Sequence, residues 1–162
     1  MKLAIDYQIA LNSPDSLIPS EQQCLEWLNK TVNILGEKKP VLLTVRIVEE
    51  VEIKQLNKDY RHKDSATNVL SFPYEKMPGV VENDEIADYL GDIIICASVV
   101  KQEALEQNKP LENHWVHMLI HGCLHLYGFD HLDNNEAEEM EALEIKILAT
   151  LLYPNPYIGN TE

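Results

Sequence analysis

Hydrophobic residues recur along this chain with two different periods, one typical of strands and one typical of helices. The clearest strand is the β-branched run Val41–Val48, which follows Pro40. Apolar stretches over residues 2–11 and 90–96 predict two more strands. A short fourth strand should end at Pro73, because proline cannot continue a ladder of backbone hydrogen bonds.

Apolar residues at helical spacing predict four or five helices, over residues 20–35, 49–61, 99–108, 110–127 and 135–151. Ser20 with Gln23 and Asn135 with Glu138 have the spacing of a capping box, and Ser98 is expected to cap the third helix. The residues expected to face inward in the second and last helices are Val51, Leu56, Tyr60, Met140, Leu143, Ile147 and Leu151. Strands mixed with helices predict an α+β fold.

The length of 162 residues and the 45% hydrophobic content predict one domain spanning residues 1–162. No run of about 18 apolar residues occurs, so no transmembrane span is expected. The first 16 residues make a poor signal peptide, and Cys24, Cys96 and Cys123 resemble reduced core residues. We therefore expect a cytoplasmic protein.

The net charge of −14 counts against a nucleic-acid partner, because binding to phosphates depends mostly on basic residues. The acidic residues gather in two clusters, which we interpret as solvated surface: Glu82, Asp84, Glu85 and Asp88, and then Glu136, Glu138, Glu139, Glu141 and Glu144. An acidic enzyme can still act on RNA if its few basic groups converge on the site. Weak binding of free RNA would follow.

The most informative stretch of the chain is residues 121–131, HGCLHLYGFDH, which contains His121, His125 and His131. The first two histidines lie four residues apart and therefore on one face of a helix, where both can reach one zinc ion. Gly128 allows the left-handed backbone that ends a helix, so the chain can turn back and bring in the third. Three nitrogen ligands leave a fourth position open, which is typical of a catalytic zinc site.

The same helix places His114, His117, His121 and His125 in one narrow stripe. Its other side is apolar: Trp115, Val116, Leu119, Ile120, Cys123, Leu126 and Tyr127. The thiol of Cys123 points away from the stripe, so we exclude it as a ligand. A lone histidine in such a helix is usually a hydrogen-bonded core residue, but three at ligand spacing predict a metal site.

The spacing HxxxHxxGxxH is also that of the metzincin proteases, in which a glutamate after the first histidine serves as the general base. Gly122 occupies that position here and can do no proton chemistry. The stretch more closely resembles the HGxLHLxGyDH signature of the YbeY family, bacterial single-domain metal-dependent endoribonucleases. The mismatch is Phe129, where that family usually has tyrosine.

Two further motifs carry the resemblance, which covers most of the chain after about residue 40. Tyr60 and Arg61 precede the segment Thr67–Phe72, TNVLSF, in which Asn68 replaces the usual aspartate. Residues 90–93, LGDI, are similar to a third, weaker motif. The resemblance implies a small mixed sheet packed with helices and a zincin-like metal-binding helix.

The resemblance also implies a function and partners. It implies a zinc-dependent, single-strand-specific endoribonuclease in ribosomal RNA maturation, including processing of the 16S rRNA 3′ end, and in ribosome quality control. One zinc ion per chain is expected, although other transition metals fit the same ligands. The implied partners are ribosomal RNA and the small ribosomal subunit, with basic ribosomal proteins or a ribosome-associated GTPase as further candidates and no membrane.

Beyond the three histidines, five residues are candidates for the site. Arg61, carried over from the family motif, would stabilise charge on the phosphate; alternatively it satisfies carbonyls at a helix end. Lys63 is a candidate contact to the substrate phosphate, or else a solvated loop charge. Ser71 is a candidate donor to the substrate, or else its hydroxyl only bonds to the backbone. Asp130 would orient a ligand imidazole or act as base, or else it only forms a turn. His117 would line the pocket, whereas His114 should lie at the open start of the helix.

Two other functions stay open at this stage. A zinc metalloprotease-like hydrolase would share the histidine spacing, but Gly122 argues against it. A ribosome-assembly factor with a structural zinc would suit the acidic surface, but a structural zinc normally has four protein ligands. The general base is not identified by the sequence.

Overall fold

The computed structural model describes residues 3–12, 17–75 and 87–158. Within these residues the chain forms, in order, β1 (Leu3–Ala10), α1 (Glu21–Ile34), β2 (Val41–Val48), α2 (Glu50–Arg61), β3 (Val69–Pro73), β4 (Asp88–Cys96), α3 (Ala97–Glu106), α4 (Leu111–Leu126) and α5 (Asn134–Thr150). The expected α+β fold is confirmed. Three members of the first acidic cluster, Glu82, Asp84 and Glu85, lie outside the described residues.

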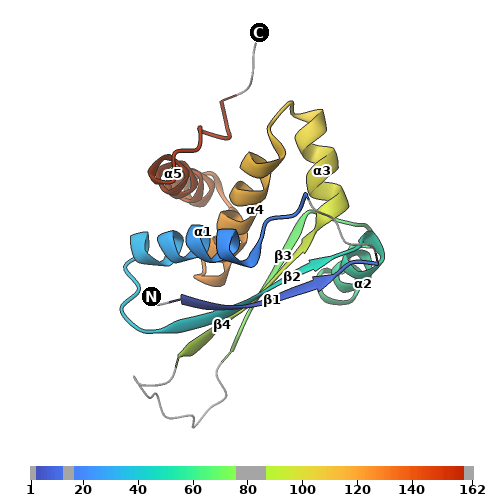
Figure 1. The fold of residues 1–162 in the computed structure, drawn as a ribbon, viewed down its shortest axis with the longest axis horizontal. Helices are drawn as coiled ribbons and strands as arrows, with labels where there is room; N and C mark the ends of the chain where they lie inside the picture. Colours follow the sequence, from blue (N-terminus) through green and yellow to red (C-terminus); the bar gives the residue numbers. More distant parts are fainter. Residues whose placement is uncertain (1–2, 13–16, 76–86, 159–162) are drawn as a thin grey trace.

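The four strands form one mixed sheet in the order β1-β2-β4-β3 (Figure 1). β1, β2 and β4 are parallel, and β3 pairs antiparallel with β4, with Ser71 opposite Ile93. The register of β2 against β4 shifts beside Gly91, which has a φ of +137°. A Cβ at Gly91 would overlap the carbonyl oxygen of Phe72, so glycine is required where β3 and β4 pair.

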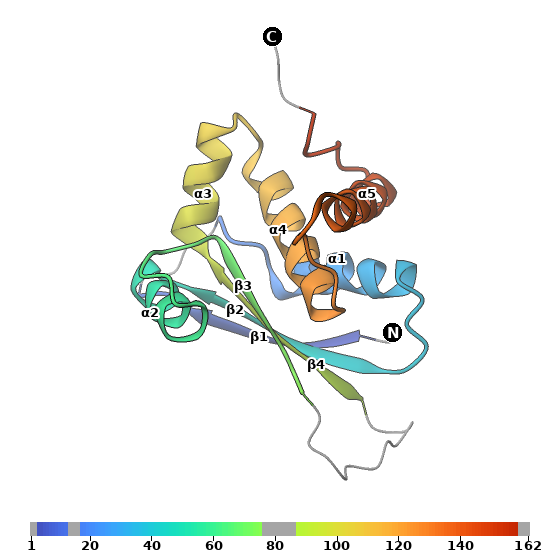
Figure 2. The ribbon, with the colours of Figure 1, turned by 180° about the vertical axis from the view of Figure 1, so that it is seen from behind.

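The helices cover the two faces of the sheet unequally. α1, α3, α4 and α5 lie on one side and α2 on the other, and α4 lies between α3 and α5 (Figures 1 and 2). The main core joins α1, α4 and α5 to the sheet and includes Leu28, Ile93 and Leu119, all fully buried. A small second cluster beneath α2 contains Val48, Ile53, Leu70, Ile94 and Cys96.

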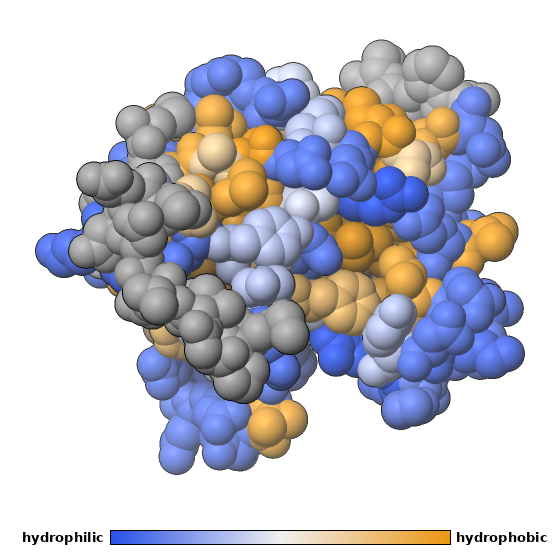
Figure 3. Space-filling view, turned by 90° about the horizontal axis from the view of Figure 1, so that it is seen from below, coloured by the Kyte–Doolittle hydropathy of each residue, from blue (hydrophilic) through white to orange (hydrophobic). Residues whose placement is uncertain are grey.

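The remaining sheet surface beside α2 carries a polar network in place of a core. Arg46 donates to Glu52 at 2.7 Å and to Gln8 at 2.9 Å, and the Thr44 and Tyr89 hydroxyls lie 2.8 Å apart. Seen from below, hydrophilic side chains are mixed with hydrophobic ones on this face (Figure 3). This half of the domain is therefore held together less by apolar burial.

Several predictions about helix ends and faces are confirmed. The capping box of Ser20 and Gln23 is present in both directions. In α5, Met140 and Ile147 are buried, and Leu143 and Leu151 pack against the main core. The three cysteines are buried and free, and among the described residues no helix is both long and apolar enough to cross a membrane.

Other local predictions are wrong. Of the three residues expected to face inward in α2, Leu56 packs against the second cluster, but Val51 and Tyr60 are 82% and 61% exposed, and the buried residues are Ile53 and Asn57. Asn57 can lie on the buried face because its amide donates to the Ser65 carbonyl at 2.9 Å, so the polar side chain is satisfied inside.

Two predicted helix caps are also wrong. α3 begins one residue before Ser98, with Cys96 as N-cap and no side-chain hydrogen bond to the cap. α5 is capped by Asp133, whose carboxylate accepts the Glu136 N–H at 2.8 Å, and not by Asn135. Aspartate is as good an N-cap as asparagine, so the sequence offered two starts two residues apart.

Candidate metal centre

The predicted metal-binding helix, α4, is the most deeply buried helix of the domain. Its apolar side packs on the sheet and on α1, while α5 covers the stripe of histidines at His117 and His121 and α3 meets it at His114. As a result His114 and His117 are only 3% and 6% exposed. The imidazole face is therefore an internal polar seam, open to solvent only near the end of α4.

At that end His121, His125 and His131 converge. Each offers one ring nitrogen, and the three nitrogens lie within 4.8 Å of one another. The ring centroids of His121 and His125 are 4.6 Å apart, and that of His131 lies 5.7 Å from the first and 5.3 Å from the second. Gly128, with a φ of +94°, makes the predicted left-handed turn that brings His131 back.

The geometry of this group fits a metal ion. The Nε2 atoms of His121 and His125 face each other at 3.1 Å. In a tetrahedral zinc site with bonds of about 2.0–2.1 Å, two nitrogens would lie about 3.3 Å apart. Burial lowers the pKa of His125, and the charge of His121 lowers it further, which favours the neutral imidazole that ligates metals.

A carboxylate that the sequence analysis had assigned to solvated surface supports this group from behind. Glu144 on α5 is fully buried, and its Oε2 accepts a hydrogen bond from His121 Nδ1 at 2.6 Å. Its Oε1 lies 3.0 Å from His117 Nε2 and accepts the Tyr157 hydroxyl. Burial raises the pKa of Glu144, but the hydrogen bonds from His117, His121 and Tyr157 outweigh it and lower the pKa to about 2.

The sequence did contain a signal for Glu144. It lies four residues after Met140 and three before Ile147, on the stripe of α5 that was correctly predicted to face inward. The acidic residues around it are exposed, as interpreted: Glu136, Glu138, Glu139 and Glu141. A carboxylate on an apolar stripe, opposite a helix rich in histidine, was the distinguishing feature.

His114 belongs to a second polar group, away from the cluster. The expectation that it lies at an open helix start is wrong, because it is buried and its Nε2 lies 2.8 Å from Glu103 Oε1. Burial lowers its pKa, although the Glu103 carboxylate partly offsets this effect. The Asn68 amide donates to the same carboxylate at 3.0 Å. An aspartate at this position would bring a second negative charge against Glu103, whereas the asparagine amide can donate to it.

Asp130 lies beside one histidine of the cluster, whereas His117 lies outside the cluster. Asp130 Oδ1 accepts the backbone N–H of His131 at 2.8 Å and lies 3.9 Å from its Nδ1, so a turn-forming contact dominates. His117 does not enter the cluster, and it contacts Glu144 and, at 3.3 Å, the Tyr157 hydroxyl.

Ser71 and Gly122 form the contact between β3 and α4. The Ser71 hydroxyl is buried and donates to the Gly122 carbonyl at 2.9 Å. A Cβ at residue 122 would lie 3.0 Å from Ile93 Cγ2 and 3.2 Å from Ser71 Oγ. A glutamate in the metzincin position would therefore crowd Ile93 and Ser71, which would have to shift to admit it.

Arg61 and Lys63 come from the other side of β3, at the end of α2. Arg61 Nη2 donates to the Ser71 carbonyl at 2.7 Å, and its guanidinium carbon lies 5.1 Å from the centre of the Phe72 ring. It thus bonds across to β3 and not to its own helix end. Lys63 is exposed just beyond the αL cap His62. Within the described part of the chain, neither residue forms a hydrogen bond or ion pair with a histidine of the cluster, and Ser71 connects Arg61 to α4.

An α+β domain in which three imidazoles converge at the end of a buried helix is typical of small metal-binding enzymes. The sequence model described as "Endoribonuclease YbeY" matches residues 9–152. A protein of that name from Hydrogenovibrio crunogenus is 53% identical over 157 residues, covering 94% of this chain and 96% of that protein. The chain therefore belongs to the YbeY endoribonuclease family, and it is a hydrolase.

Structural comparison agrees with this assignment. The solution structure of TM1509 from Thermotoga maritima matches with a TM-score of 0.55 and 25% identity, over 92% of both chains. The order of helices and strands around the histidine helix is thus that of a known fold.

Proposed function

We propose that this protein is a zinc-dependent, single-strand-specific endoribonuclease that acts in ribosomal RNA maturation, including the 16S rRNA 3′ end, and in ribosome quality control. Family membership supports the reaction class. The observation that carries the metal dependence is the convergence of three ring nitrogens within 4.8 Å.

His121, His125 and His131 would hold one zinc ion, on a helix like that of the zincins. Neutral imidazoles suit zinc, and other transition metals of similar preference could take its place. When bound, such an ion polarises phosphoryl oxygens and makes water more acidic. Among the described residues the group has three members, which leaves room for substrate.

Glu144 would orient the imidazole of His121 in this arrangement. By accepting a hydrogen bond from Nδ1 of His121, it keeps the proton on that nitrogen and leaves the Nε2 lone pair free towards the cluster. Three donors already surround the carboxylate, so it is poorly placed to take a proton from substrate. We assign it an orienting role.

Arg61 would stabilise the negative charge that develops on the phosphate. One N–H bonds to the Ser71 carbonyl and the ring of Phe72 lies against the guanidinium, so the other donors are available for phosphate oxygens. Lys63 is exposed beside it and would contact the RNA backbone. The Ser71 hydroxyl already bonds to Gly122, so a substrate contact there requires that bond to be shared.

The acidic surface is consistent with a substrate presented by a partner. A net charge of −14 disfavours capture of free RNA, and Glu136, Glu138, Glu139 and Glu141 are exposed on α5. These carboxylates would suit basic ribosomal proteins on the small subunit, with cleavage of rRNA in the cytoplasm. A ribosome-associated GTPase is a further candidate partner.

The alternative functions are less well supported. A protease would need a base at residue 122, where this chain has glycine, and a structural zinc is normally closed by a fourth protein ligand, whereas the group among the described residues has three members. The test is to incubate the zinc-loaded protein with single-stranded RNA, double-stranded RNA and an unstructured polypeptide. We expect cleavage of single-stranded RNA that stops with a chelator. Metal-dependent cleavage of the polypeptide, with RNA intact, would contradict the proposal.

A further inference from the structure

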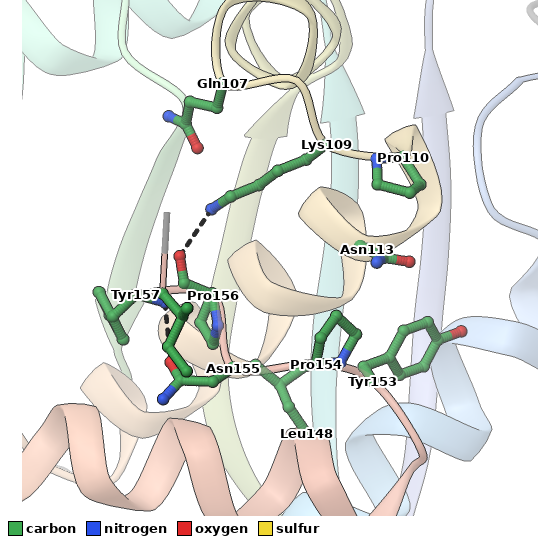
Figure 4. Close-up of a pocket in the computed structure, with 11 residues that line it drawn as sticks. Gln107, Lys109, Pro110, Asn113, Leu148, Tyr153, Pro154, Asn155, Pro156 and Tyr157 are labelled. Atoms are coloured by element: carbon green, nitrogen blue, oxygen red, sulfur yellow. Dashed lines mark hydrogen bonds between the residues drawn. The ribbon is translucent and has the colours of Figure 1, made fainter. Parts of the chain in front are cut away.

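The last described segment of the chain, residues 153–158, returns from the end of α5 to the first turn of α4. We call it the C-terminal strap. It lies beyond residues 9–152, the part matched by the family model. The Lys109 ammonium donates to the Pro156 carbonyl at 3.0 Å, and the Asn155 side chain accepts the Tyr157 N–H at 2.8 Å (Figure 4). These bonds fix where the Tyr157 side chain enters the fold.

Tyr157 reaches the buried carboxylate behind the histidines. Its hydroxyl donates to Oε1 of Glu144, and its ring lies edge-on to His117 with the centroids 5.4 Å apart. The opposite oxygen of the same carboxylate accepts from Nδ1 of His121 at 2.6 Å. A rotation of the carboxylate about its own axis would therefore break bonds at both ends.

Tyr157 also closes the seam from solvent. It lines a cavity of about 510 Å³ between the strap and the start of α4, together with Lys109, Asn113 and Leu148 (Figure 4). It also lines a second cavity, which contains His121, His131 and Glu144. The phenol ring thus stands between the cavity at the strap and the carboxylate that orients the cluster.

We propose that Tyr157 is a positioning residue for His121, acting through Glu144, and that the strap adds this support to the core of the family fold. The proposal rests on the proposed function, in which His121 binds the metal. Partners that orient a metal-binding histidine normally raise its affinity for the ion, because they fix both the tautomer and the ring.

The chain offers a matched control in the other tyrosine of the strap. Tyr153 also donates its hydroxyl to a carboxylate, that of Glu112 at 2.5 Å, and its ring packs edge-on against Trp27. Glu112 is exposed and none of its recorded bonds reaches a histidine. Tyr157→Phe and Tyr153→Phe therefore remove the same kind of bond, and only the first touches the seam.

The experiment measures zinc affinity by competition with a chromogenic chelator, on the full chain, and then kcat and KM on single-stranded RNA at saturating zinc. We expect Tyr157→Phe to bind zinc about tenfold more weakly, at the low end of the 10–100-fold range for such partners, with kcat lowered and KM unchanged. Tyr153→Phe should match the unmodified protein. Lys109→Met should weaken zinc binding less than Tyr157→Phe, and add nothing to it in the double variant.

The outcomes separate this proposal from the proposed function. If the unmodified chain binds zinc and Tyr157→Phe binds it equally tightly, the positioning role is wrong while the metal centre stands. Equal weakening by Tyr153→Phe would also overturn it, since the effect would then be general to the strap. If the unmodified chain binds no metal, the proposed function itself fails and this proposal falls with it.

Discussion

The two sides of β3 hold their candidate residues by different means. On one side α4 contributes to a core of 24 buried hydrophobic residues among those described, and its His117 and His121 rings bond to the two oxygens of the Glu144 carboxylate. On the other side Arg61 ends a helix whose cluster has five buried residues. Its guanidinium is held by one hydrogen bond to the Ser71 carbonyl and by contact with the Phe72 ring.

This difference indicates two kinds of task. Side chains fixed by packing and by buried hydrogen bonds are preorganised, as a metal site requires. A guanidinium at an exposed helix end can shift to follow a flexible substrate at lower cost. We therefore expect changes on the α4 side to abolish the site, and changes on the α2 side to weaken a reaction that can still occur.

The largest effect should come from His125→Ala. It removes one of the three proposed ligands, so metal content should fall to near zero and metal-dependent cleavage of RNA should be lost. The ring is half-buried, and the variant should stay folded by circular dichroism. Elemental analysis of the purified variant measures the effect. Full metal content would show that the cluster is not the binding site.

The next effect should come from Arg61→Ala. Loss of charge stabilisation at comparable sites lowers kcat by about 10²–10³-fold, and we expect that range here with the metal content unchanged. Arg46→Ala is the matched control, because Arg46 bonds to Glu52 and Gln8 on the sheet surface. If Arg61→Ala cleaves RNA at the unmodified rate, Arg61 has no role in the reaction.

A smaller effect compares the two cores directly. Leu119 and Ile53 are both fully buried, the first in the main core and the second beneath α2. Truncation of either to alanine should cost about 2–5 kcal/mol in the free energy of unfolding, with Leu119→Ala towards the upper end because its surroundings can relax less. Urea denaturation measures both values. A larger loss for Ile53→Ala would reverse our view of the two sides.

The smallest effect concerns pH. Burial lowers the pKa of His114 below its ordinary 6.5, so the unfolded chain binds a proton at higher pH than the folded one. The free energy of unfolding should therefore be fully maintained above pH 6.5 and fall as the pH drops through that value. His114→Gln should make this decline shallower in urea titrations at pH 7.5 and 5.5. An unchanged slope would mean that His114 does not contribute.

Much of this arrangement could be predicted from local sequence. The strands Val41–Val48 and Asp88–Cys96 are apolar runs, and the histidine spacing with Gly128 gave the cluster because all its members lie within eleven residues. A helix and its terminal turn are enough to bring them together.

The missing parts depend on contacts between distant segments. Glu144 is buried where α5 lies against α4, and Tyr157 reaches it from the strap, which Lys109 and Asn155 help to hold in place. The sequence offered Asp130, which adjoins His131, as a candidate orienting carboxylate, whereas the carboxylate that bonds to Nδ1 of His121 is 23 residues away from that histidine. Proximity along the chain was a poor guide to proximity in space.

The central claim is that one metal ion, held by His121, His125 and His131, is required for cleavage of RNA. The most direct measurement is to strip the protein with a chelator, titrate zinc back, and follow cleavage of a fluorogenic single-stranded RNA. The account predicts no cleavage without metal and a linear rise that ends at one equivalent per chain. Full cleavage by the stripped protein, or a rise that His125→Ala follows equally, would contradict it.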